Sequence, residues 1–188
     1  MEYIHDFKIN PYDLISSDWI RPFDKEEYMT KYVKDWRSIF NKETVDKFEP
    51  HVQKVMIFNK PKDWNESSKG NSVHIDEGGI TCALNIVLPT ENNSSIMQWY
   101  ETDIPSEELL IGSQSNYAKR WNEESWSQDR FQLIHEEFID NKVCLVRVDI
   151  PHKIVVCQSA RVCISVRFRN ILSMEWNDAI GYVDKLLN

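Results

Sequence analysis

Hydrophobic and polar residues alternate in short runs along much of this chain, which is the pattern of β-strands with one buried face. Residues 161–169 show it most clearly. Alternation places Arg161, Cys163, Ser165 and Arg167 on one face and Val162, Ile164, Val166 and Phe168 on the other. The pattern predicts further strands within 1–10, at 52–58, around 74–76, and at 80–88, 96–101, 131–139, 143–150 and 152–157.

Helical spacing occurs near both ends of the chain. From about Ser17 to Phe48, apolar residues recur at intervals of three and four, with Asp24 as a candidate N-cap. This predicted helical stripe consists of Tyr28, Tyr32, Val33, Trp36, Ile39 and Phe40. A shorter helix is predicted from Ser173 to Leu187. Residues 102–126 are polar with interspersed aromatics, which fits either a lid over a site or an ordinary insertion.

Composition fits one folded unit. The 188 residues are 41% hydrophobic and 12% aromatic, which is typical of a globular protein with a sizeable core. Many short strands flanked by terminal helices predict a mainly β protein of jelly-roll type, with a single domain spanning 1–188. The chain has no run of about 18 apolar residues and no recognisable signal peptide, so we expect a cytoplasmic protein that does not cross a membrane.

Charge and cysteine usage exclude some functions. The formal net charge of −8 disfavours nucleic acid as a partner, because affinity for phosphate backbones rests largely on Lys and Arg. The four cysteines, Cys82, Cys144, Cys157 and Cys163, form no C-x-x-C pair, and each lies in an apolar run. We therefore interpret them as small buried side chains in a reducing compartment rather than as zinc ligands.

The candidate chemistry begins at His74-Ile75-Asp76. In a strand, residues i and i+2 leave the same face, so His74 and Asp76 would point to one spot while Ile75 packs on the other side. A second histidine, His152, follows the predicted strand 143–150. Two histidines and one carboxylate form the iron(II)-binding triad of non-haem oxygenases.

Several segments in the same order resemble the 2-oxoglutarate/Fe(II)-dependent dioxygenases, in particular short phage and bacterial members of that superfamily. The segments are His74-Ile75-Asp76, Ala83 to Pro89, Trp99-Tyr100, Val148 to His152 and Arg161 to Arg167, within a motif-bearing core of about residues 52–170. The resemblance implies a double-stranded β-helix, a cupin-like jelly roll. It also implies an oxidoreductase that uses Fe(II), 2-oxoglutarate and dioxygen, and releases succinate and carbon dioxide while hydroxylating a substrate.

The resemblance also implies a basic residue that grips the far carboxylate of 2-oxoglutarate. Fe(II) with one Asp carries a charge of +1 and the co-substrate −2, so one further cation neutralises the assembly, and Arg binds a carboxylate with two parallel hydrogen bonds. Family members have this Arg about as far beyond the distal His as Arg161 lies beyond His152, so the resemblance favours Arg161. The family often has Ser two residues beyond this Arg, where the chain has Cys163, so Arg167 beside Ser165 remains the alternative.

Two further residues have alternative interpretations. Asn85 interrupts an apolar strand, and its amide needs either backbone partners or the co-substrate. Tyr100 stands where the superfamily often places a hydroxyl against 2-oxoglutarate, although an aromatic residue within a strand also explains it. The expected substrate is a small molecule or a protein side chain. The alternative function is a cupin-type metal-binding isomerase or sugar-binding protein, which would have no need of the Arg161 clamp.

Overall fold

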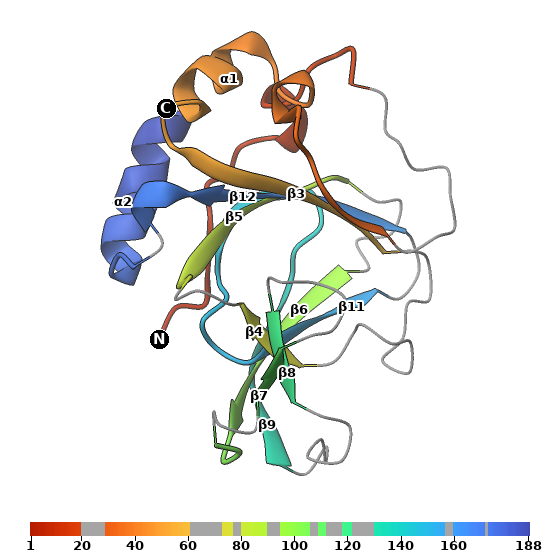
Figure 1. The fold of residues 1–188 in the computed structure, drawn as a ribbon, viewed down its shortest axis with the longest axis vertical. Coiled ribbons are helices and arrows are strands. Elements are labelled where there is room, and N and C mark those ends of the chain that lie inside the picture. Colours follow the sequence, from red (N-terminus) through yellow and green to blue (C-terminus); the bar gives the residue numbers. More distant parts are fainter. Residues whose placement is uncertain are drawn as a thin grey trace.

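The computed structural model describes residues 1–19, 29–60, 73–76, 80–89, 95–105, 109–111, 118–121, 130–156, 160–171 and 173–188. Its strands form two six-stranded antiparallel sheets that face each other, with helices on the outer side of one of them (Figure 1). The architecture is therefore mainly β, as the alternating pattern predicts.

The first sheet has the order β1-β10-β5-β12-β3-β2. Its strands are β1 (Ile4–Asp6), β2 (Met29–Tyr32), β3 (Val52–Lys60), β5 (Cys82–Val87), β10 (Lys142–Arg147) and β12 (Arg161–Phe168). The second sheet has the order β7-β8-β4-β11-β6-β9. Its strands are β4 (His74–Asp76), β6 (Ser95–Thr102), β7 (Leu109–Ile111), β8 (Ala118–Trp121), β9 (Phe131–Phe138) and β11 (His152–Val156).

Helices α1 (Lys42–Phe48) and α2 (Trp176–Leu187) cover the outer face of the first sheet (Figure 1). The side chains of Val162, Ile164, Val166 and Phe168 pack on this side, in one core cluster with Phe48 and Val183 of the helices. A separate core cluster lies between the sheets and includes Ala83, Met97, Trp99 and Cys163. The two faces of β12 are thus divided as alternation predicts.

Most predicted strands are confirmed, and their ends differ from the predicted ones by at most three residues. A turn at Asp140-Asn141 leads from β9 into β10, and Asn141 has a positive φ of 55°, a backbone conformation that Asn tolerates well. The C-terminal helix begins at Trp176, with Glu175 as its N-cap, rather than at the predicted Ser173.

The predicted helix from Ser17 to Phe48 is wrong over most of its described length. Tyr32 ends strand β2, a 3-10 turn spans Trp36–Ser38, and the α-helix begins only at Lys42. Asn41 explains this start, because its side chain accepts a hydrogen bond from the backbone N–H of Thr44. The apolar spacing instead reflects a compact segment, in which Trp36, Ile39 and Phe40 pack on the first sheet. Asp24 and Tyr28 lie outside the described residues.

No helix in the described part of the chain is both long and apolar enough to cross a membrane. The question of a lid or an insertion over residues 102–126 concerns a segment that falls largely outside the described residues.

Candidate metal centre

The pairing of β4 with β11 brings the two candidate histidines together. His74 and His152 are direct cross-strand neighbours, and their ring centroids are 4.4 Å apart. Side chains opposite each other in an antiparallel pair lie on the same face, so both imidazoles point into the space between the sheets. The sequence contains no signal for this pairing, because 75 residues lie between the two strands.

Asp76 joins the same cluster from the end of β4. Its backbone N–H donates to the carbonyl of Val148 at 2.9 Å, which ties the short strand to the segment leading into β11. One ligand atom from each of His74, Asp76 and His152 lies within 4.8 Å of the others. Ile75 faces the opposite way and packs beside Val73 and Tyr100. The predicted i, i+2 arrangement is therefore present.

His152 is held in the tautomer that a metal requires. Its Nδ1 lies 2.8 Å from the carbonyl oxygen of Ile150, which accepts but does not donate, so Nδ1 carries the proton and Nε2 keeps its lone pair. Burial lowers the pKa of His152, while the neighbouring Asp76 carboxylate and the Ile150 carbonyl act in the opposite direction. The imidazole is thus neutral at neutral pH, as metal ligation requires.

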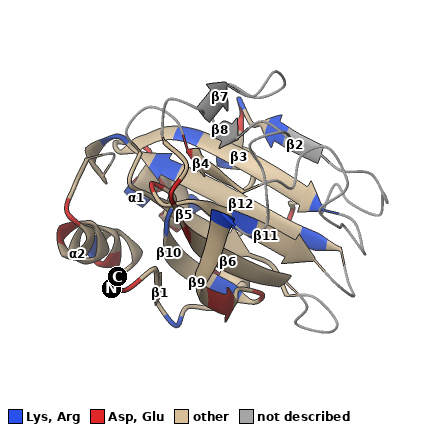
Figure 2. Cartoon of the chain, turned by 90° about the horizontal axis from the view of Figure 1, so that it is seen from below, with Lys and Arg blue, Asp and Glu red and all other residues tan. Residues whose placement is uncertain are grey.

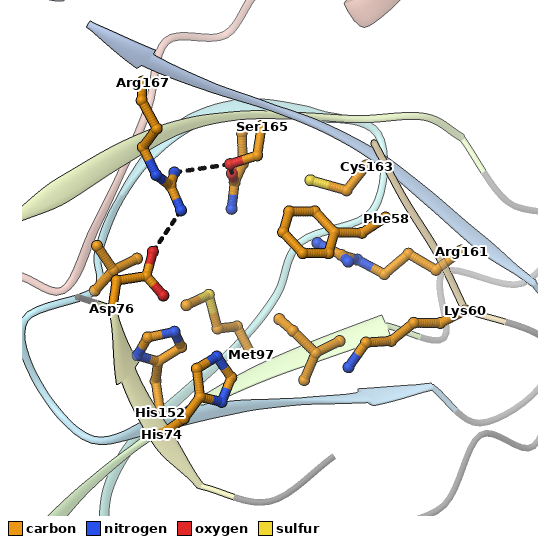
Figure 3. Close-up of a pocket in the computed structure, with 13 residues that line it drawn as sticks. Phe58, Lys60, His74, Asp76, Met97, His152, Arg161, Cys163, Ser165 and Arg167 are labelled. Carbon is orange, nitrogen blue, oxygen red and sulfur yellow. Dashed lines mark hydrogen bonds and ion pairs between the residues drawn. The ribbon is translucent and has the colours of Figure 1, made fainter. Parts of the chain in front are cut away.

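Arg167 reaches across from β12 to the Asp76 carboxylate. Its Nη2 donates to Asp76 Oδ2 at 2.5 Å, and both side chains are only 4% exposed. The same guanidinium donates through Nη1 to Ser165 Oγ at 2.8 Å, and Ser165 in turn donates to Asn85 Oδ1 at 2.6 Å (Figure 3). A continuous hydrogen-bonded chain therefore joins the candidate metal ligand on the second sheet to two strands of the first.

The three candidate ligands stand at one end of a pocket between the sheets. The pocket encloses an empty volume of about 550 Å³, part of it open to solvent. Its other lining residues are Phe58, Lys60, Asn85, Met97, Val148, Ile154, Arg161, Cys163, Ser165 and Arg167. Figure 3 shows Lys60 and Arg161 on the far side of the pocket from His74, His152 and Asp76.

Lys60 and Arg161 make the far end of the pocket strongly basic. They are direct cross-strand partners on β3 and β12, and are 6% and 2% exposed. Arg161 Nε is buried without a hydrogen-bond partner in the described structure. A buried donor without an acceptor is costly, so an anion bound beside Arg161 would offset this penalty.

Basic positions also lie on β3, β11 and β12 in the charge-coloured view (Figure 2), although the whole chain is acidic. Asp76 is the one acidic residue among the described residues that line the pocket. The basic character of the pocket is therefore a local feature of these strands.

The structure divides the two arginines that the sequence leaves as alternatives. Arg167 is paired with Asp76 at the metal end, whereas Arg161 faces the far end. Cys163, between them on β12, also lines the pocket. Burial raises the pKa of this thiol against the opposing charges of Arg161 and Arg167, so it remains a neutral thiol.

Tyr100 is placed outside the pocket. Its hydroxyl donates to Gln98 Oε1 at 2.7 Å, and its ring packs edge-on against Phe131 in the cluster behind β4. The reason is strand alternation. Trp99 pairs with His152 and faces the interior, so its neighbour Tyr100 faces outward. The expected contact between Tyr100 and 2-oxoglutarate is therefore not supported by its position.

Sequence reasoning missed Lys60, Phe58 and Met97 among the pocket residues. The signal for the first two was present, because Phe58 and Lys60 occupy alternate positions of the strand that pairs with β12. The predicted strand ended at residue 58 and so excluded Lys60. Met97 is presented by β6, and no charge or motif distinguishes it from core methionines.

Comparison with protein-family models and with curated protein sequences finds no match for this chain. The case for a function therefore rests on the pocket itself. Two imidazoles and a carboxylate suit iron(II) and related divalent ions, so the donor set fits such a metal. The buried, unpartnered Arg161 Nε fits an anionic group at the opposite end.

Proposed function

We propose that this protein is a non-haem iron(II) oxygenase that uses 2-oxoglutarate and dioxygen to oxidise a bound substrate. The proposal rests on a single pocket with two chemically different ends. His74, Asp76 and His152 converge at one end, and the buried Arg161 stands at the other. The ordered resemblance of these segments to 2-oxoglutarate-dependent dioxygenases supports the same interpretation.

At the first end, His74, Asp76 and His152 would hold the iron. Three protein ligands leave positions open on a six-coordinate ion for the co-substrate and dioxygen. When bound, iron(II) would activate dioxygen, which would oxidise both 2-oxoglutarate, to succinate and carbon dioxide, and the substrate. The Ile150 carbonyl keeps the lone pair of His152 Nε2 available, and Arg167 fixes the orientation of the Asp76 carboxylate.

At the second end, Arg161 would bind the far carboxylate of the co-substrate, with Lys60 adding positive charge from β3. A guanidinium binds a carboxylate through two parallel hydrogen bonds, which fixes orientation as well as position. Within this proposal the two facing antiparallel sheets form a double-stranded β-helix, with the pocket between them.

The decisive experiment is an anaerobic titration of the purified protein with iron(II) followed by 2-oxoglutarate. A weak visible charge-transfer band is expected when both are present, and its loss is expected in Asp76→Asn. The matched control is His135→Ala, a histidine on the edge strand β9 that does not line the pocket. Metal binding without any effect of 2-oxoglutarate would contradict the proposal and favour a cupin-type metal protein.

A further inference from the structure

The chain of hydrogen bonds from Asp76 to Asn85 has a fixed direction. Arg167 is a donor through every nitrogen and has no acceptor atom. Ser165 Oγ therefore accepts from Arg167 Nη1, and its single proton must go elsewhere. In a buried site the available acceptor is Asn85 Oδ1, at 2.6 Å.

The reverse orientation of the Asn85 amide does not satisfy these contacts. With Nδ2 towards Ser165, two donors would meet at Oγ, and the serine proton would be buried without an acceptor, which costs free energy. The separation of 2.6 Å is also typical of an O–H···O bond and short for N–H···O. Because Oδ1 is committed to Ser165, Nδ2 is the remaining polar group of Asn85.

Asn85 lies within the pocket wall, and no described residue accepts a hydrogen bond from its Nδ2. It is the direct cross-strand partner of Ser165, which places it between the Arg167 and Arg161 positions of β12. Residues two apart on a strand are separated by about 7 Å. A donor therefore stands part-way along the pocket, between the metal end and the basic end.

We propose that Asn85 is a ligand-binding residue whose amide is locked as a donor by Ser165 and Arg167, so that it selects an unprotonated acceptor oxygen such as a carboxylate. Ser165 is then a positioning residue that acts through Asn85. This inference rests on the proposed function for the identity of the ligand, 2-oxoglutarate. The orientation of the amide, with Oδ1 towards Ser165 and Nδ2 left as a donor, follows from the hydrogen-bonded chain alone.

Two substitutions of Asn85 separate ligand binding from a structural role. Asn85→Ala removes the donor, whereas Asn85→Asp removes it and also adds a negative charge. We expect carboxylate affinity to fall about tenfold or more in Asn85→Ala and further in Asn85→Asp. If Asn85 served only as the acceptor for Ser165, Asn85→Ala would lower the stability of the protein but leave carboxylate affinity close to that of the wild type. The affinity of Asn85→Ala therefore decides, because the charge added in Asn85→Asp repels a carboxylate in either case.

The measurement is calorimetric titration of the manganese(II)-loaded protein with 2-oxoglutarate, oxaloacetate, succinate and citrate. Asn170→Asp is the matched control, because Asn170 is exposed and bonds to Tyr182 away from the pocket. Its affinities should equal those of the wild type. Ser165→Ala frees the amide to rotate and should lower affinity several-fold, while Ser165→Thr retains a hydroxyl and should restore it.

The outcomes distinguish this inference from the proposed function. If the wild type prefers another carboxylate to 2-oxoglutarate, the proposed function fails, and the Asn85 variants are judged with the carboxylate that binds best. If Asn85→Ala binds that ligand as tightly as the wild type, the inference fails while the proposed function stands. Failure of the wild type to bind any of the four carboxylates would overturn both.

Discussion

The guanidinium of Arg167 on β12 is bonded to the carboxylate of Asp76 on β4, so this ion pair links the two sheets at the candidate metal centre. Both side chains are almost completely buried. Such a pair restrains the carboxylate in position, but it also makes each partner dependent on the other. Removing one partner leaves an uncompensated buried charge.

Arg167→Ala should therefore destabilise the metal-free protein by about 3–5 kcal/mol. Added manganese(II) should recover part of this loss, because the ion supplies a positive partner for Asp76. Urea unfolding with and without the metal measures both effects. The control is Arg169→Ala, an exposed arginine two residues away that should change stability little. Equal effects of the two substitutions would mean that the ion pair contributes nothing to stability.

Substitution of any candidate ligand should abolish metal binding. The variants that remove a ligand or its charge are His74→Ala, Asp76→Asn and His152→Ala. A site with only three protein ligands should lose most of its metal affinity when any one of them is removed. Asparagine is preferred at position 76, because alanine would leave Nη2 of Arg167 without an acceptor. Metal content after equilibrium dialysis gives the result, with His135→Ala as the control. A variant with wild-type metal content would remove that residue from the site.

Asp76→Glu should also fail to bind the metal, although it retains the charge. The longer side chain displaces the carboxylate by about 1 Å or more, which exceeds the tolerance of a preorganised site. It also changes the contact with Arg167. Metal affinity equal to that of the wild type would show that the site adjusts to the extra methylene.

Which side chains share one face of a strand was predictable from sequence. Which side chains meet across the two sheets was not. Alternation correctly assigned Arg161 and Arg167 to one side of β12, because a buried sheet divides residues by their periodicity. The contact between Arg167 and Asp76 depends instead on how the two sheets face each other. Side-chain patterns within one strand carry no information about that placement.

The helix predicted from Ser17 failed because apolar spacing was taken as evidence of helix in a segment whose described residues, 17–19 and 29–48, contain no long regular element. Ile39 and Phe40 are indeed buried, as the spacing indicates. Their burial results from a 3-10 turn and a short helix that begins after Asn41. Lys60 was overlooked because the predicted strand ended before the polar residues that follow Phe58. In the structure β3 extends through Lys60, whose side chain lines the pocket.

The buried cysteines predict a loss of stability at alkaline pH. Burial raises the pKa of Cys82 to about 11, and an exposed thiol in the unfolded chain has a pKa of about 8.5. Stabilisation is therefore complete below the unfolded pKa and is lost as the pH rises towards the folded value, since the unfolded state releases its proton first.

For Cys82 the loss at pH 10 should be about 2 kcal/mol. Urea unfolding of the wild type and Cys82→Ala at pH 7.5 and 10, with reductant present, isolates this contribution. The wild type should lose more stability than the variant between the two pH values. An identical loss of stability in the wild type and in Cys82→Ala would contradict a raised pKa of Cys82 in the folded protein.

Nucleic acid should not bind at physiological salt, because the net charge of −8 repels phosphate and the basic side chains of the pocket are buried. Fluorescence anisotropy with labelled single- and double-stranded oligonucleotides checks this expectation. Salt-sensitive binding below micromolar concentration would contradict it and would point to a nucleic-acid substrate.

The two arginines should differ in their effects on 2-oxoglutarate. Arg161→Ala should retain the metal but lose several kcal/mol of co-substrate affinity, because truncation leaves a carboxylate buried without its partner. Arg161→Lys should recover only part of the loss, since an ammonium group does not reproduce the two parallel bonds. Arg167→Ala, in protein loaded with metal, should weaken 2-oxoglutarate by about 1 kcal/mol or less.

The apparent dissociation constant for 2-oxoglutarate in each variant, with metal occupancy checked, tests this order. Lys60→Ala serves as an internal comparison, because Lys60 lies opposite Arg161 and should have a smaller effect in the same direction. If Arg167→Ala lowers 2-oxoglutarate affinity most, the carboxylate is bound near Ser165 and Arg167 on β12. The unpartnered Arg161 Nε then needs another explanation. If neither arginine matters, the far end of the pocket does not bind 2-oxoglutarate, and a metal-binding protein of cupin type becomes the better interpretation.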